Sequence, residues 1–356
     1  MTSNIKYVGM DVHKESISLA VRNAAGKIVM ECVIETKANT ILQFCDGLRG
    51  DVQVTFEEGT WAAWLHDLLK PHVTKLVVCD PRRNALLLDG NQNDRVDARK
   101  LSDLLYMNKL NTVYHGDHGL RTLKELGRSY LTMTRDQSRV MSRIKAIYRS
   151  WAIPCSGKQV YGSRHRAEWL GKILEPGVHR RAEWYYQQLD ALRTLRQEVR
   201  RDLLAESKKH KIWKRLCAIP SIGPIRAAEL LGILQTPHRF RTKRQLWTYC
   251  GLAVVTSSSA DHEVEHGQLR RRKKRKETRG LNENCNHDLK DLFKGAAVVA
   301  STKPGPFAEF YAALLGKGMR PEMARLTLAR KIATIVLIVW KRGVCFDAQY
   351  LKPQTA

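Results

Sequence analysis

The sequence lacks the paired cysteine spacings of zinc sites and disulfide frameworks. Its eight cysteines are scattered without a Cys-x-x-Cys pair, and several lie inside apolar runs such as KLVVCD and WTYCGLAV. A reduced thiol in such a run packs as a small hydrophobic side chain. The pattern is typical of a reducing cytosol and argues against a disulfide-stabilised secreted domain.

Signals for export and membrane insertion are also missing. The N-terminal MTSNIKYVGM does not have the charged and then apolar segments of a signal peptide. The longest apolar run, Ile332 to Trp340, is too short to cross a bilayer. We therefore expect a cytoplasmic protein, in a bacterial-type cytosol or nucleoid.

Negative charge is scarce relative to positive charge. Lys and Arg total 61 against 35 Asp and Glu, which gives a formal net charge of +26 and an isoelectric point near 9.9. Such an excess of positive charge repels itself, and binding to a polyanion relieves this repulsion. Each phosphate contacted by Lys or Arg also releases counterions, which favours binding further. Nucleic acid is therefore the expected partner, in preference to a ribosomal or membrane surface.

The chain is long enough, at 356 residues with 43% hydrophobic residues, for two or three domains with a real core. Its first part alternates strand and helix patterns, which predicts a mixed α/β domain whose acidic residues fall at strand ends or at a helix start. The expected strands are three within residues 5–34, VQVTFEE and KLVVCD, and the expected helices are 39–48, 61–69 and one that begins in NDRVDARKLSDLL.

A helical middle follows, in which apolar residues recur at spacings of three and four. This is a heptad seam, interrupted by Gln137 and ending before Pro154. A second helix is expected from Arg180 to about His210. The two helices form either an antiparallel hairpin within one chain or a dimerising coiled coil. The first carries Leu123, Leu126, Tyr130, Met133, Val140, Ile144 and Ile147, and the second carries Leu189, Leu192, Leu195, Val199 and Leu203.

Four acidic residues are candidates for a metal site. Asp11 interrupts a buried strand directly after VGM, and Glu57 ends the strand VQVTFEE. Asp94 and Asp97 lie one helical turn apart, so their carboxylates point to one helix face. Four carboxylates together repel one another unless cations offset them, and hard oxygen ligands of this kind bind Mg²⁺.

A purely structural interpretation of the helix start is also open. Asp94 is favoured near a helix N-terminus by the helix dipole, and Asp97 is spaced to pair with Lys100. Glu58 competes with Glu57 for the same role, because strand alternation decides which of them faces the site. Asp103, further along the same helix, is expected to be a surface acid.

Two segments of the third region are candidates for contacts with nucleic acid. AIPSIGPIRAAELL matches a helix-hairpin-helix, whose turn presents backbone N–H groups to a phosphate without reading bases. An unbroken basic run further on is suited to following a phosphate backbone, of DNA or RNA alike. The turn residues are Ser221, Ile222 and Gly223, and the basic run is Arg270, Arg271, Arg272, Lys273, Lys274, Arg275 and Lys276.

A serine cluster lies between these segments, in TSSSADHE. Serines in loops usually form turns. The sequence has neither a Gly-x-Ser-x-Gly elbow nor a clear Ser-His-Asp order, so the residues alone do not identify a nucleophile. A nucleophilic serine nevertheless stays open as an interpretation, because His262 and the phosphate-binding cations of the basic run flank the cluster.

These motifs together resemble a known family. VGMDVHKES, VTFEEGT and NDRVDARKLSDLL resemble the N-terminal DEDD domain of the insertion-sequence 110 family transposases. AIPSIGPIRAAELLGIL, FRTKRQLWTYCGL and the serine segment resemble its C-terminal transposase domain. The resemblance spans nearly the whole chain in the family's order. It implies an α/β RNase H-like (RuvC-type) domain at 1–115, a helical coiled-coil middle at 116–210 and a mainly α transposase domain at 211–356.

The resemblance also implies the chemistry. Asp11, Glu57, Asp94 and Asp97 become ligands of two Mg²⁺ ions, and Ser259 becomes the nucleophile that forms a covalent link to DNA. The residue after that serine, commonly glycine in the family, is Ala260, and the family's Glu-x-x-Gly becomes EEGT. Glu58, Ser257 and Ser258 therefore stay open as alternatives.

The implied protein is a recombinase of a mobile element. It would cut and rejoin DNA, guided by a structured noncoding RNA that the element encodes, as a homo-oligomer of two or four copies whose helical middle serves assembly. Three alternatives differ in chemistry. They are a RuvC-like structure-specific nuclease that uses water, a nucleic-acid chaperone that uses only its basic surface, and an actin-like ATPase, which the missing Gly-rich phosphate loops disfavour.

Overall fold

The structure is a computed structural model that describes residues 4–81, 93–116, 120–258, 262–265, 268–271 and 277–351. The chain divides into two compact units, Met1–His115 and Gly116–Ala356. Each unit has its own hydrophobic core, and each is described by itself.

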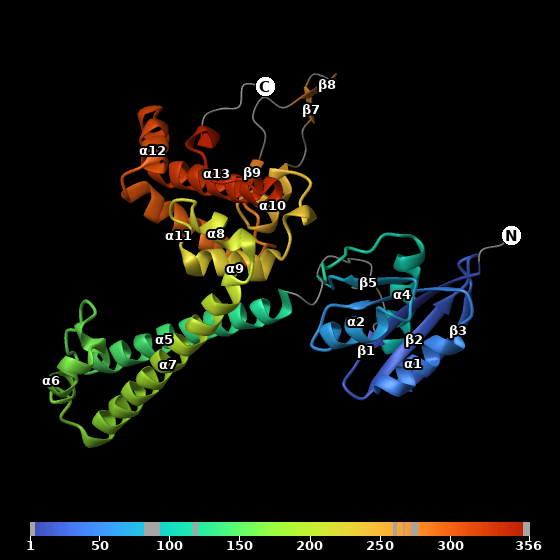
Figure 1. Cartoon of the computed structure of the whole chain (residues 1–356), viewed down its shortest axis with the longest axis horizontal. Coiled ribbons are helices and arrows are strands. Elements are labelled where there is room, and N and C mark those ends of the chain that lie inside the picture. The colour runs from blue at the N-terminus through green and yellow to red at the C-terminus, as the bar shows by residue number, and fades with distance from the viewer. Residues whose placement is uncertain are drawn as a thin grey trace. The chain divides into compact units, whose positions relative to one another are not determined.

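The first unit contains a five-stranded mixed sheet (Figure 1). Its strand order is β3-β2-β1-β4-β5, with β1 antiparallel to β2, β2 antiparallel to β3, and β1, β4 and β5 parallel. This mixed α/β sheet is the one the sequence predicts, and its order is compatible with an RNase H-like domain. The strands are β1 (Ile5–Val12), β2 (Ser16–Arg22), β3 (Ile28–Glu35), β4 (Asp51–Glu57) and β5 (Lys75–Cys79).

Helices pack on both faces of this sheet. On one face, α1 (Ala38–Gly47) and α2 (Ala62–Leu69) cover the main core, which includes Met10 and Phe56. On the other face, α4 (Asp94–Tyr106) packs against β1, β2 and β4. Because side chains alternate between the faces of a strand, residues next to Met10 and Phe56 point toward α4.

The second unit begins with a helical hairpin (Figure 1). Helix α5 (Arg121–Ser150) packs along α7 (Pro176–Lys208), and the connection contains η2 (Gln159–Tyr161), η3 (Ser163–His165) and α6 (Arg166–Leu170). Tyr148, near the end of α5, meets Tyr186, near the start of α7, with their hydroxyl oxygens 3.0 Å apart. The pairing is therefore antiparallel, and α7 of the same chain fills the seam of α5.

The seam departs from a regular heptad pattern at two positions. Gln137 occupies an apolar position and accepts a hydrogen bond from Arg196 Nη1 at 3.0 Å, so its side chain is satisfied inside the hairpin. Leu195 is 47% exposed, whereas Leu189 and Leu203 are buried. Packing of the second helix thus follows only part of its apolar pattern.

The rest of the second unit is mainly helical. Its core includes Leu123 and Leu203 from the hairpin, so the helical middle and the C-terminal region share one core. The helices are α8 (Lys211–Cys217), α9 (Pro224–Leu234), η4 (Pro237–Arg239), α10 (Lys243–Tyr249), α11 (His287–Thr302), α12 (Pro306–Gly316), α13 (Pro321–Arg342) and η5 (Ala348–Leu351). None of the helices in the described ranges combines the length and the apolar character that a membrane crossing requires.

Two short ribbons connect α10 to α11. Strand β6 (Val254–Ser258) pairs antiparallel with β9 (Glu277–Leu281), and β7 (His262–Glu265) pairs antiparallel with β8 (Gln268–Arg271). Ser257 and Ser258 therefore belong to a strand, whereas the sequence pattern favours a loop there. Three consecutive β-branched residues, Val254, Val255 and Thr256, give this segment its β propensity.

Candidate metal centre and nucleic-acid interface

A glycine on β1 lets α4 approach the sheet closely. A Cβ atom on Gly9 would lie 2.2 Å from the carbonyl oxygen of Ala98 and 2.4 Å from the amide nitrogen of Ser102. Real Cβ atoms are never this close to backbone, so only glycine allows this contact. Asp11 lies two residues after Gly9 on the same strand face, which directs its side chain toward α4.

The start of α4 is fixed by its cap. The side chain of Asn93 accepts a hydrogen bond from the amide of Val96 at 2.9 Å, which satisfies one of the free N–H groups at the helix N-terminus. This cap places Asp94 and Asp97 in the first turn. Both carboxylates therefore belong to the end of α4 that lies beside Asp11.

A salt-bridge clamp holds α4 to the edge strand β3. Glu31 accepts hydrogen bonds from Arg95 Nη2 at 2.6 Å and from Arg99 Nη2 at 2.7 Å. These hydrogen bonds from Arg99 and Arg95 lower the pKa of Glu31 to about 2. Further along the helix, Asp103 pairs with Arg22 at 3.3 Å, so it takes no part in the acidic site.

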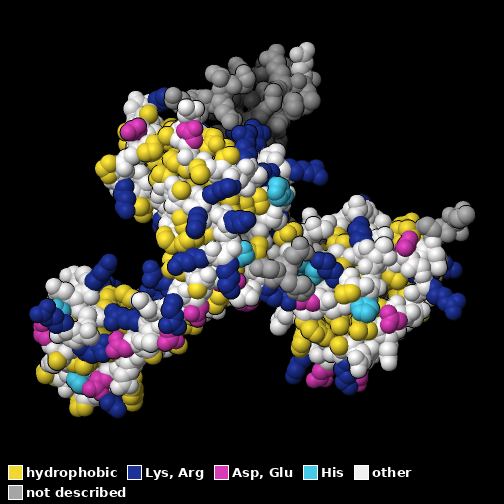
Figure 2. All heavy atoms as spheres, in the orientation of Figure 1, with side chains coloured by type: hydrophobic (Ala, Val, Ile, Leu, Met, Phe, Trp, Pro, Cys, Tyr) yellow, Lys and Arg dark blue, Asp and Glu magenta, His cyan; other side chains and the backbone are white. Residues whose placement is uncertain are grey.

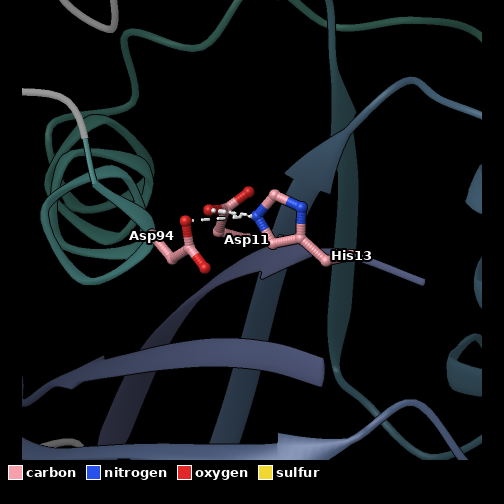
Figure 3. A group of neighbouring side chains, drawn as sticks. All are labelled: Asp11, His13 and Asp94. Atoms are coloured by element: carbon pink, nitrogen blue, oxygen red, sulfur yellow. Dashed lines mark hydrogen bonds and ion pairs between the residues drawn. The ribbon is translucent and has the colours of Figure 1, made fainter. Parts of the chain in front are cut away.

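Asp11, His13 and Asp94 form a tight group (Figure 3). Nε2 of His13 lies 3.1 Å from Oδ2 of Asp11 and 3.4 Å from Oδ1 of Asp94. Burial raises the pKa of Asp11, as do the Asp94 and Asp97 carboxylates, although His13 acts in the opposite direction. Burial lowers the pKa of His13, but the two carboxylates outweigh it, so this pKa is raised.

Glu57 joins the group from the neighbouring strand. The register pairs Met10 with Phe56, so Asp11 and Glu57, each one residue further, lie on the same face of adjacent strands. Burial raises the pKa of Glu57, and the carboxylates of Asp11, Asp97 and Asp80 raise it further. Asp11 therefore interacts with Glu57, Asp94 and Asp97, and Glu57 also interacts with Asp97.

Glu58 points elsewhere. Its carboxylate lies 2.6 Å from Nε2 of His115, and its amide donates to the carbonyl oxygen of Cys79 at 2.8 Å. Strand alternation separates the two acids, and it leaves Glu57 as the one that faces α4.

The helix-start interpretation of Asp97 is compatible with this site. Nζ of Lys100 lies 3.6 Å from Oδ1 of Asp97, which is the ion pair that the i,i+3 spacing predicts. That oxygen is buried and accepts no hydrogen bond from any residue in the described ranges. A buried carboxylate oxygen without a donor costs free energy, and a bound cation removes that cost. The hard oxygen donors of the group therefore suit a divalent metal ion.

Two residues of the site escaped the sequence prediction. His13 follows Asp11 in an Asp-x-His spacing, which puts both on one side of a strand end, and that spacing is a usable signal. Asp80 directly follows β5 in KLVVCD, the third parallel strand of the sheet. The carboxyl ends of parallel strands meet at one edge of a sheet, so Asp80 comes near enough to Glu57 to raise its pKa.

The segment predicted to be a helix-hairpin-helix runs from α8 through a turn into α9. Ser221 adopts a left-handed conformation (φ +70°), and its carbonyl oxygen accepts a hydrogen bond from Arg226 Nη1 at 2.8 Å. The side chain of Ile222 is buried, and its amide donates to the carbonyl oxygen of Ile219 at 3.0 Å. Ile222 thus anchors the turn, and Gly223 is exposed, whereas the hydroxyl oxygen of Ser221 is buried and has no hydrogen-bond partner in the described part of the chain.

Basic side chains are spread over the helices of the second unit (Figure 2). Of the predicted basic run, Arg270 and Arg271 lie in β8, and Arg272, Lys273, Lys274, Arg275 and Lys276 lie outside the described residues. Ser259 also lies outside them, directly after β6. The predicted serine and the basic run therefore remain sequence predictions.

Comparison with known families agrees with this architecture. A model described as Transposase, for the DEDD transposases of IS110, matches residues 8–150, and a model described as Transposase IS116/IS110/IS902 family matches residues 213–279. Together they span more than half of the 356 residues. No curated protein matches the chain. A transposase of this kind cuts DNA and uses divalent metal ions. The chain carries both transposase domains of the IS110 family and belongs to that family.

Proposed function

We propose that the protein cuts and rejoins the DNA of a mobile insertion sequence, with an RNase H-like first unit as its metal-dependent centre. One observation carries this proposal: Asp11, Glu57 and the two aspartates of α4 converge from three separate elements on one site. Mg²⁺, in two positions, is the proposed metal because every one of these four ligands is a carboxylate oxygen.

The protein's own residues set up this chemistry. Asp11 is central, since both Glu57 and the α4 aspartates interact with it. The Glu31 clamp and the Gly9 contact hold α4 at the distance the site requires. Divalent ions bound here would neutralise charge that develops on the scissile phosphate and on its leaving oxygen.

A serine nucleophile completes the proposed reaction. The hydroxyl of Ser259 loses its proton as its oxygen forms a bond to phosphorus, the phosphodiester bond to the leaving deoxyribose breaks, and the leaving oxygen takes up a proton. Reversal of this step on a second DNA end rejoins the strand. Support comes from the sequence position of Ser259, which directly follows β6 within the residues that match the second family model.

The second unit is proposed to bind nucleic acid, including a noncoding guide RNA. The exposed Gly223 caps the N-terminus of α9, where backbone dipoles favour a phosphate, and Ser221 lies two residues before it in the turn. The run Arg270–Lys276 adds contacts that follow a phosphate backbone without reading its bases.

Assembly is proposed to use the hairpin. Large apolar side chains are exposed along it and near its tip, where Leu174 is 91% and Trp184 is 56% exposed. Trp151 and Leu195 are also exposed. A second copy that covers these side chains would bury apolar area. The acids and Ser259 belong to different units, so an oligomer can combine the acids of one copy with the serine of another.

The test is a covalent-adduct assay with DNA that contains the ends of the element. The wild type is expected to form a protein–DNA adduct that resists denaturation, and Ser259→Ala is expected to abolish it. Asp11→Asn is expected to abolish both the adduct and strand cleavage.

The adjacent serines provide the matched controls. Ser257→Ala and Ser258→Ala should keep the adduct if Ser259 is the nucleophile. Cleavage that persists in Ser259→Ala without any adduct, and with the other serines replaced as well, would instead identify a nuclease that uses water.

A further inference from the structure

The structure assigns His13 as a direct ligand of a metal ion held between Asp11 and Asp94, and this position therefore prefers a transition-metal cation such as Mn²⁺ over Mg²⁺. The inference rests on the proposed metal centre and adds a nitrogen ligand to it. It divides the centre into two unlike positions, one with imidazole and one with oxygen donors alone.

The distances fit shared coordination. Ligand atoms about 2.1 Å from one ion and at right angles to each other lie about 3 Å apart. Nε2 of His13 lies 3.1 Å from Oδ2 of Asp11 and 3.4 Å from Oδ1 of Asp94. Figure 3 shows the imidazole edge turned toward both carboxylates, one from the end of β1 and the other from α4.

The backbone of His13 is fixed on both sides. Its amide donates to the carbonyl oxygen of Ser16 at 2.9 Å, and its carbonyl oxygen accepts from the Thr36 hydroxyl at 2.9 Å. The tight β1–β2 turn thus holds the imidazole beside Asp11, which reduces the conformational entropy lost on binding.

The surface pair of His72 and Asp46 shows what an ordinary contact looks like in this unit. It joins one imidazole to one carboxylate at 3.7 Å, and Asp46 belongs to α1, on the opposite face of the sheet from α4. His13 differs because it meets two carboxylates from two elements within the reach of a single ion.

The remaining acids leave an oxygen-only position. Glu57 interacts with Asp11, Asp97 and Asp80, all of which offer oxygen donors only. Imidazole binds Mn²⁺ and later first-row metals more readily than Mg²⁺, which takes oxygen ligands. The centre would therefore have two positions with different metal preferences.

Pulsed electron paramagnetic resonance of Mn²⁺ bound to the full chain, purified without a histidine tag, tests the ligand directly. The wild type is expected to show ¹⁴N modulation from a coordinated imidazole. His13→Gln is expected to lose this modulation and to bind Mn²⁺ at least tenfold more weakly at this position, with Mg²⁺ affinity changed less than threefold. His72→Gln is the matched control and is expected to keep the modulation.

The outcomes separate the inference from the proposed function. Modulation that persists in His13→Gln, or Mn²⁺ binding without any ¹⁴N coupling in the wild type, overturns the ligand assignment and leaves the four-acid centre intact. If the wild type and Asp11→Asn bind Mn²⁺ equally weakly, the result overturns both the His13 assignment and the proposed metal centre.

Discussion

Single residues decide the electrostatics of the metal centre. Asp11 and Glu57 are partly removed from water and face further carboxylates, so the pKa of each is raised. The folded chain without metal therefore binds more protons near these groups than the unfolded chain does. Metal binding and proton binding compete for the same negative charge.

The first prediction concerns the pH dependence of stability. An acid with a raised pKa in the folded state makes the unfolding free energy fall as pH rises, from about pH 4 up to the raised pKa. Asp97→Asn removes one repelling charge, so the metal-free variant should exceed the wild type in stability by about 1 kcal/mol at neutral pH. Thermal unfolding in chelator between pH 4 and 8 measures this difference.

The same variant should lose the stabilisation that added divalent metal gives the wild type, because a ligand is gone. Equal unfolding temperatures of the two proteins at every pH in chelator would contradict close packing of the four carboxylates.

The sequence alone predicts individual residues of the candidate site better than it predicts their arrangement. Asp11 and Glu57 were identifiable because a charge at the end of a buried strand has few structural explanations. Asp94 and Asp97 allow two interpretations: the ion pair with Lys100 confirms the structural one for Asp97, and the metal-ligand role of both stays a prediction. His13 and Asp80 were missed because their roles depend on which strand ends lie together, and sheet order is not written in local spacing.

At the scale of elements, the position of α4 depends on one missing side chain. Gly9→Ala would place a methyl group against the backbone of α4 at Ala98 and Ser102. The helix must move, at a cost of about 1–3 kcal/mol, and its aspartates move away from Asp11. We expect a lower unfolding temperature and Mn²⁺ affinity reduced at least tenfold, measured by calorimetry.

Gly47→Ala is the control for this substitution, since a Cβ atom there meets no atom within 4 Å. Unchanged metal affinity in Gly9→Ala would show that the site does not depend on how closely α4 packs.

The hairpin allows a second test at this scale. Ile144 is fully buried between α5 and α7, so Ile144→Ala should lower the unfolding free energy by about 2–5 kcal/mol. The loss should not depend on protein concentration, because the partner helix belongs to the same chain. Leu195→Ala, at an exposed seam position, should have little effect on the unassembled chain, at the lower protein concentration. Denaturant unfolding at two protein concentrations measures both.

The elements show the limit of pattern reasoning. The heptad spacing identified both long helices, and α7 begins at Pro176 rather than at Arg180 because Glu175 caps it. The pattern did not determine whether one chain or two would fill the seam, since both bury the same residues. The strand character of Ser257 and Ser258 depends on pairing with β9, about twenty residues away, which no local pattern encodes.

At the scale of the whole molecule, the charge of +26 predicts strongly salt-dependent binding to DNA. Each phosphate contact contributes roughly 0.9 to the slope of log affinity against log salt concentration. Replacing Lys273, Lys274 and Lys276 by Gln should therefore reduce the slope by about 2 to 3. Fluorescence anisotropy with labelled duplex DNA at several salt concentrations measures it.

A control with the same net charge replaces three lysines that already pair within the protein. Lys37, Lys172 and Lys209 lie 2.7, 2.9 and 2.6 Å from the carboxylates of Glu35, Glu168 and Glu206. If this variant reduces the slope as much as the first, overall charge rather than the basic run determines binding.

The pairing of β6 with β9 bears on which insertions and deletions the chain can accept. Ser258 pairs with Glu277, so the chain leaves the helical core and returns to it at one place. Residues 259–276 contain the candidate serine and the basic run, and they join two positions that the pairing of β6 with β9 holds together. Because the entropy of closing a loop grows slowly with its length, we expect insertions and deletions within residues 259–276 to leave the helical core folded.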